Sequence, residues 1–143
     1  MNTNEEMLQF LHKSASMSVD SATRVLEQTR DSKMKKELCS QINTYRRFAD
    51  DATRELKNHG LVPEDNKLMT KIMSDVGIIA NMMIDRTPSH VAELMINGTN
   101  MGVLKMNKHL NRNKDIDPKT ESLCRELIDF QKKCVCNLEP YLS

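Results

Sequence analysis

The feature that most constrains this fold is a regular spacing of apolar side chains along most of the chain. In the C-terminal segment the steps alternate between four and three residues from Thr120 to Tyr141. This spacing places every member on one face of an α-helix, here called the seam of that helix. The members of this seam are Thr120, Cys124, Leu127, Gln131, Cys134, Leu138 and Tyr141. The pattern predicts a helix packed along a coiled-coil-like stripe.

Two further long helices are predicted in the N-terminal half. The first begins at Thr3, which stands in capping-box spacing with Glu6. Its seam is Leu8, Leu11, Ala15, Ser18, Ala22 and Val25. The second begins at Asp31–Ser32 and ends before Gly60, a residue suited to a helix C-terminus. Its seam is Leu38, Ile42, Tyr45, Ala49, Ala52 and Leu56. The short link between them predicts an antiparallel hairpin.

The remainder of the chain is predicted to hold two more helices and the full length of the C-terminal one. A shorter one covers residues 66–85, and the next follows Thr87 as N-cap with Pro88 in its first turn and ends near Arg112. The seam predicted for that helix is Val91, Leu94, Gly98, Met101 and Lys105. The last helix begins at Asp117–Pro118 and runs to Tyr141.

These elements predict an all-α fold in a single domain over residues 1–143. Aromatic residues make up only 3% of the chain, which disfavours a sheet. Two long hairpins joined by a traversing segment predict an antiparallel four-helix bundle with an extra crossover helix.

The helix order and two phrases resemble the ferritin-like superfamily. The phrases are LCSQINTYRRFADDATRELKNHGLVPED and TPSHVAELMINGTNMG, the second also resembling uncharacterised proteins of Firmicutes. The resemblance covers nearly the whole chain and implies a small bacterial four-helix bundle of the ferritin-like type.

Active members of that superfamily hold two metal ions with inward Glu residues and Glu-x-x-His pairs. No Glu-x-x-His occurs in this chain, and Gln131 and Cys134 stand where such a pair is expected. We therefore expect no dimetal site, no cofactor and no metal.

Polar residues are predicted at the centre of the bundle in place of metal ligands. They are Ser18, Tyr45, Asn97, Asn100, Gln131 and Cys134. One interpretation is a hydrogen-bonded layer that fixes helix register, as a buried Asn does in coiled coils. The other is a small polar pocket for a ligand or a non-standard metal.

The four cysteines do not form a metal-binding motif. Cys124 and Cys134 are seam positions, where a reduced thiol acts as a small apolar group. Cys136 lies on the other side of the helix from Cys134, so the two cannot ligate one ion. A metal site using Cys134, or redox sensing through Cys136 or Cys39, remains an alternative to buried structural thiols.

Two glycines four residues apart, Gly98 and Gly102, interrupt the fourth predicted helix. Each costs ~1 kcal/mol relative to Ala in a helix interior, so a compensating contact is expected. Close helix packing is the first interpretation, and a dimer contact or a ligand in the groove is the alternative.

The charge pattern, the targeting signals and the serine positions of the sequence argue against several functional classes. A net charge of +1, with basic clusters at 33–36 and 105–114 that lack interleaved aromatics, predicts no nucleic-acid binding. No signal peptide and no membrane span is recognised, so a cytoplasmic protein is expected. Ser14, Ser16 and Ser18 find no histidine on a matching helix face, so no Ser-His hydrolase is predicted.

The sequence thus favours a non-catalytic ferritin-like bundle that acts by self-association, most simply as a homodimer, or by binding a partner. One alternative is a metal-binding or oxidoreductase protein with a site at Cys134, Gln131 and Tyr45. Another is a spore-coat-like or stress-associated structural protein.

Overall fold

The computed structural model describes residues 1–64 and 85–143, and these form an all-α structure. Its helices are α1 (Thr3–Gln28), α2 (Ser32–Asn58), α4 (Pro88–Arg112) and α5 (Pro118–Leu138), with a final 3₁₀ turn η1 (Glu139–Tyr141). The helix predicted over residues 66–85 falls, but for its last residue, outside the described residues. The all-α prediction is confirmed.

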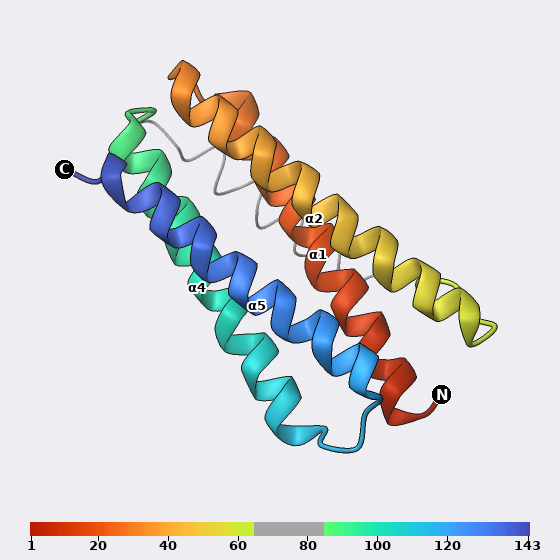
Figure 1. Cartoon of the computed structure of the whole chain (residues 1–143). Coiled ribbons are helices and arrows are strands. Elements are labelled where there is room, and N and C mark those ends of the chain that lie inside the picture. Colours follow the sequence, from red (N-terminus) through yellow and green to blue (C-terminus); the bar gives the residue numbers. More distant parts are fainter. Residues whose placement is uncertain (65–84) are drawn as a thin grey trace.

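The four helices form two hairpins, α1 with α2 and α4 with α5, which pack together (Figure 1). Helices α1 and α5 run in one direction, and α2 and α4 run in the other. The end of α2 and the start of α4 therefore lie at opposite ends of the bundle.

Helix boundaries follow local capping chemistry. The Asp31 carboxylate accepts a hydrogen bond from the Met34 N–H at 2.9 Å, and the Thr87 hydroxyl accepts one from the His90 N–H at 3.3 Å. The predicted cap at Thr87 is confirmed, and so is the predicted start of the second helix at Asp31–Ser32. Gly60 has φ +74°, and the Leu61 N–H donates back to the Leu56 carbonyl at 2.9 Å, which closes α2 as predicted.

The predicted cap of α1 is wrong by one residue. Asn2 rather than Thr3 is the N-cap, and its side chain accepts from the Glu5 N–H at 2.8 Å while the Glu5 carboxylate accepts from the Asn2 N–H. Asn2–Glu5 and Thr3–Glu6 have the same spacing, so the sequence offers two equivalent starts.

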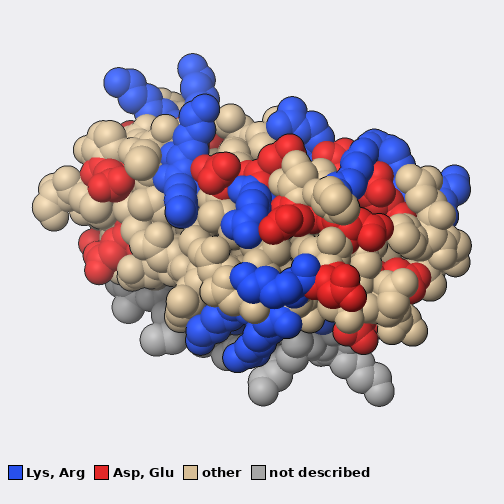
Figure 2. Space-filling view, turned by 60° about the horizontal axis from the view of Figure 1, so that its bottom comes forward, with Lys and Arg blue, Asp and Glu red and all other residues tan. Residues whose placement is uncertain are grey.

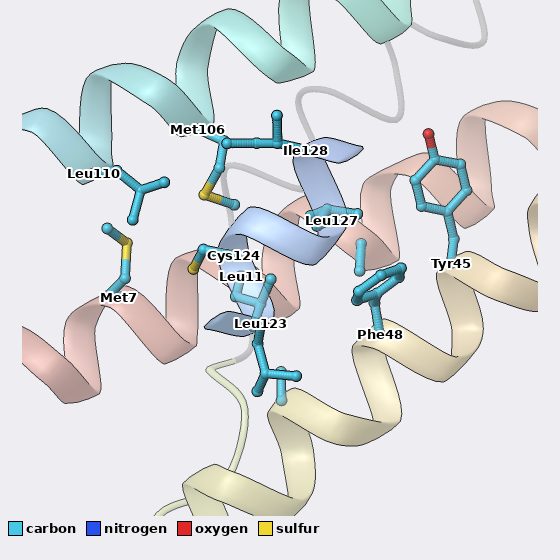
Figure 3. Packing of buried hydrophobic residues seen from close by; sticks show 12 residues of the cluster. Met7, Leu11, Tyr45, Phe48, Met106, Leu110, Leu123, Cys124, Leu127 and Ile128 are labelled. Carbon is cyan, nitrogen blue, oxygen red and sulfur yellow. The ribbon is translucent and has the colours of Figure 1, made fainter. Parts of the chain in front are cut away.

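The described residues form two large apolar clusters in the core, one toward each end of the bundle. The first, the Leu127 cluster, takes side chains from all four helices, which converge on α5 in Figure 3. Its members are Met7, Leu11, Ala15, Tyr45, Phe48, Ala52, Met106, Leu110, Leu123, Cys124, Leu127 and Ile128. The second, the Leu38 cluster, contains Ala22, Val25, Met34, Leu38, Ile42, Val91, Ala92, Met95 and Leu138.

The predicted seam of α4 is in the wrong register, whereas those of α1, α2 and α5 agree with the observed burial. Gly98, Met101 and Lys105, which were expected to face the core, are exposed. The residues of α4 that are buried are Val91, Ala92, Met95, Thr99, Met106 and Leu110. Apolar residues cover much of the circumference of this helix, so its sequence permits two stripes and contacts with the other helices select one.

Two polar side chains near the start of α1 hold distant loops. The Gln9 amide donates to the Val62 carbonyl at 2.9 Å and accepts from the Glu64 N–H at 2.9 Å. Five residues earlier, the side-chain Oδ1 of Asn4 accepts from the Asp117 N–H at 2.9 Å. Asp117 makes no side-chain cap for α5, so this bond fixes the entry to that helix instead.

Candidate functional site

A buried polar layer separates the two apolar clusters at the middle of the bundle. Tyr45, Gln131 and Cys134 are 2%, 3% and 1% exposed, and Ser18 is half-buried beside them. Burial raises the pKa of Tyr45 above its ordinary value, the neighbouring Cys134 raises it further, and hydrogen bonding with Gln131 and Ser18 lowers it in part. The structure thus brings together four of the six predicted central residues.

The other two predicted members do not belong to this layer. Asn97 and Asn100 are exposed on α4, whereas Thr99 between them is 7% exposed. This difference follows from the shifted register of α4. Thr99 was missed because its seam spacing with Met95 and Met106 competes with the spacing that runs through Gly98 and Met101.

Beside the polar layer, a cavity of about 420 Å³ lies between α1 and α4. Tyr45 of α2 and Gln131 of α5 reach its wall, so all four described helices contribute to it. Its volume is within the ~300–1,000 Å³ typical of small-molecule sites. The sequence offered a ligand in the groove at Gly98 and Gly102 only as an alternative, because a cavity depends on helix separation as well as on which residues face inward.

The cavity exists because small residues face each other across it. Ser14, Ser18 and Ser21 recur along the α1 wall, and Gly98 and Gly102 recur along the α4 wall. Such side chains cannot fill the space between two helices. The Ser18 hydroxyl donates to the Ser14 carbonyl at 3.0 Å, so its oxygen remains available as an acceptor.

The two glycines have different surroundings. A Cβ added at Gly98 would meet no described residue within 4 Å, so the predicted close packing is not found against the described helices at that position. A Cβ added at Gly102 would lie 2.7 Å from Nε2 of Gln131. Gly102 therefore does allow a close approach, and it makes room for the Gln131 amide.

The side-chain oxygen of Gln131 is an unsatisfied hydrogen-bond acceptor among the described residues. Its Oε1 atom is buried and has no hydrogen-bond partner among residues 1–64 and 85–143. A buried acceptor without a donor costs about 1–3 kcal/mol. A ligand that brings a hydrogen-bond donor into the cavity would offset this cost if the Gln131 side-chain amide turned its carbonyl oxygen toward that donor.

The cysteines occupy the positions that the seam predicts. Cys124 and Cys134 are buried, and Cys39 and Cys136 are exposed. Burial raises the pKa of the Cys124 and Cys134 thiols to about 12, which disfavours the thiolate that ligates metals and attacks disulfides. Among residues 1–64 and 85–143, no group of three or more His, Cys, Asp or Glu side chains is placed to hold a metal ion.

One serine–histidine pair does form, contrary to the prediction. The Ser16 hydroxyl lies 3.5 Å from Nε2 of His12, one turn earlier on α1. Burial lowers the pKa of His12, and the nearby Asp50 carboxylate raises it in part. Both residues lie in the interior of α1, where backbone N–H groups are used by the helix, so the pair has no local oxyanion hole.

The charged surface shows no concentration of one sign on the face seen in Figure 2, where basic and acidic side chains are interspersed. The bases of 33–36 and 105–114 lie at the start of α2 and in the second half of α4, and so belong to different hairpins. In the described part of the chain, no helix has an apolar stretch suited to crossing a bilayer.

In the described residues, the fold and site define an all-α protein with four helices in two hairpins and a polar layer and a cavity at mid-height. Comparisons with protein-family models, with curated proteins and with solved structures found no match for this chain.

Proposed function

We propose that this chain is a ferritin-like bundle without a dimetal site that acts by binding a small, largely apolar molecule in the α1/α4 cavity. The observation that carries the proposal is the cavity itself, an opening of about 420 Å³ in a bundle whose ends are closely filled. The ferritin-like assignment rests on helix direction, since parallel α2 and α4 require one long crossover connection.

The walls of the cavity suit a ligand of this kind. Met17, Met95 and Met101 line it, and methionine side chains adapt to ligands of varied shape. Tyr45, Gln131 and Ser18 supply a few polar groups at its middle. A largely apolar wall with few polar groups is the usual composition of a small-molecule site.

Binding of an uncharged probe tests the proposal. We would label the methionine methyl groups with ¹³C and titrate decanol, following the NMR signals of Met17, Met95 and Met101. Met34, which is fully buried in the Leu38 cluster, serves as an internal reference. The expected result is a saturable shift of the three cavity signals with little change at Met34.

A matched pair of variants locates the binding. Gly98→Leu places a side chain into open space at the cavity wall and should abolish the shifts. Asn97→Leu adds a comparable side chain at the adjacent exposed position and should leave them intact. Absence of saturable binding, or equal behaviour of two folded variants, would overturn the proposal.

Metal content and solution mass test the remaining expectations. Plasma mass spectrometry on reduced protein grown with iron, manganese and zinc should find no tightly bound ion, and one or two per chain would instead support a site at Cys134. Self-association as a homodimer remains a prediction, which light scattering at several protein concentrations would test.

A further inference from the structure

The α1/α4 cavity has two chemically different ends. Helices α1 and α4 run antiparallel, and the Phe10 ring stacks on the His109 ring at a centroid distance of 3.6 Å. One turn inward from this stack, Lys13 of α1 and Lys105 of α4 both line the cavity, at the same level of the bundle.

The opposite end is apolar. Val25 of α1 and Met95 of α4 line it and belong to the Leu38 cluster, and Leu94 packs against that cluster. Lys13 and Val25, like Lys105 and Leu94, are eleven or twelve residues apart on their helices. At ~1.5 Å per residue the cavity wall is therefore about 16–18 Å long from the basic end to the apolar end.

The charge at the basic end is not balanced locally. Neither Lys13 nor Lys105 forms an ion pair with a described residue, and no acidic residue of the described chain lines the cavity. Burial lowers the pKa of the His109 imidazole, and the charge of Arg112 lowers it further. His109 therefore adds little positive charge near neutral pH. Among the described residues that line the cavity, the two lysines are thus the charged groups that a ligand would contact.

Building on the proposed function, we infer that the ligand is an anionic amphiphile, a medium-length acyl chain with a carboxylate bound between Lys13 and Lys105. The chain lies along Met17 and Met101 and ends against Val25 and Leu94. The length of the wall and the opposite character of its ends carry this assignment.

Three ligands of equal chain length test the inference by the same methyl NMR titration, below their micelle concentrations. Decanoate, decanol and decylamine differ in head group only. We expect decanoate to bind about tenfold more tightly than decanol, as one charge-assisted contact allows, and decylamine to bind more weakly than decanol.

Lysine variants assign the preference to its residues. The double variant Lys13→Gln/Lys105→Gln should lose the tenfold preference for decanoate and keep the wild-type affinity for decanol. Lys108→Gln removes an exposed charge from the same helix outside the cavity and should change neither affinity.

The possible failures are distinguishable. Equal binding of decanoate and decanol, or tighter binding of decylamine, would overturn the carboxylate assignment while the cavity remained a binding site. An unchanged preference in the double lysine variant would overturn the role of Lys13 and Lys105. Binding of none of the three ligands would overturn both the inference and the proposed function.

Discussion

The Leu127 cluster and the α1/α4 cavity draw on the same four helices but on different kinds of side chain. In the cluster, Tyr45, Phe48 and the adjacent Phe130 meet between α2 and α5, with ring centroids 5.1 and 5.9 Å from Phe130. In the cavity, serines of α1 face Gly98 and Gly102 of α4. Large side chains on both helices fill one space, and small ones on both leave the other open.

This contrast shows that a regular seam does not by itself determine a filled core. Helix α1 contributes to both regions, with Leu11 and Ala15 in the cluster and Ser14 and Ser18 at the cavity. Neighbouring faces of one helix thus serve two purposes, stability on one side and an opening on the other.

Truncation of one side chain in each region tests the contrast most strongly. Phe48→Ala should lower the free energy of unfolding by about 3 kcal/mol, because the ring is buried among close neighbours. Met17→Ala removes a half-buried side chain from the cavity wall and should cost about 1 kcal/mol. Urea unfolding measures both, and equal costs would show that the two regions are packed alike.

Alkaline pH tests whether the Leu127 cluster excludes charge. The pKa of Cys124 is raised to about 12 by burial, with a smaller opposing effect of Arg125 and a raising effect of Glu121. A raised folded-state pKa gives stability that is complete below the ordinary value of 9.0 and is lost as pH rises toward 12. At one pH unit above that ordinary value the loss is about 1.4 kcal/mol.

Cys124→Ala should remove this part of the pH dependence between pH 8 and 10, whatever its effect at neutral pH. The exposed Cys136→Ala is the control and should retain the wild-type slope. The same slope in both variants would mean that the Cys124 thiolate is tolerated inside the cluster.

The two glycines of α4 provide a smaller and more local test. Gly98→Ala should raise the free energy of unfolding by up to ~1 kcal/mol, because alanine favours the helix and its methyl group meets open space. Gly102→Ala should gain less or lose stability, because its methyl group would displace the Gln131 amide. The opposite order of stabilities in thermal unfolding would show that the open space does not lie beside Gly98.

Gln131→Leu should produce the smallest effect. The substitution removes a buried acceptor that has no partner, while Tyr45 loses a polar neighbour, so the two effects offset each other. We expect a folded variant whose stability is within about 1 kcal/mol of the wild type. Circular dichroism and urea unfolding check this, and global unfolding would show that the polar layer is required for the fold.

Local sequence signals predicted much of this fold. The caps at Asp31 and Thr87 and the glycine stop at Gly60 depend only on nearby residues, so they could be read directly. The seam of α5 was equally clear because its other buried apolar residues, Leu123 and Ile128, flank that stripe and form no second one. The register of α4 was not clear from the sequence. Leu94 and Met95 are adjacent and both apolar, so each belongs to a different apolar stripe, and only packing against the other helices selects one of the two stripes.

The candidate site was predicted in part. Ser18, Tyr45, Gln131 and Cys134 share a level of the bundle because seam positions at similar heights must meet. A ligand pocket was only an alternative interpretation, and its basic end was not predicted, because both require the distance between α1 and α4 and the alignment of Lys13 with Lys105. Those are tertiary properties that no helical period encodes.

The bonds of Asn4 and Gln9 have a consequence for how this protein opens. Because the loop at Val62–Glu64 and the entry to α5 at Asp117 both depend on the first turns of α1, fraying of those turns would release both. The N–H groups of Glu64 and Asp117 are 53 residues apart in the sequence, yet their exchange with deuterium should report one shared opening event. Common exchange of the two groups would make the start of α1 a single cooperative unit with two segments that the sequence places far from it.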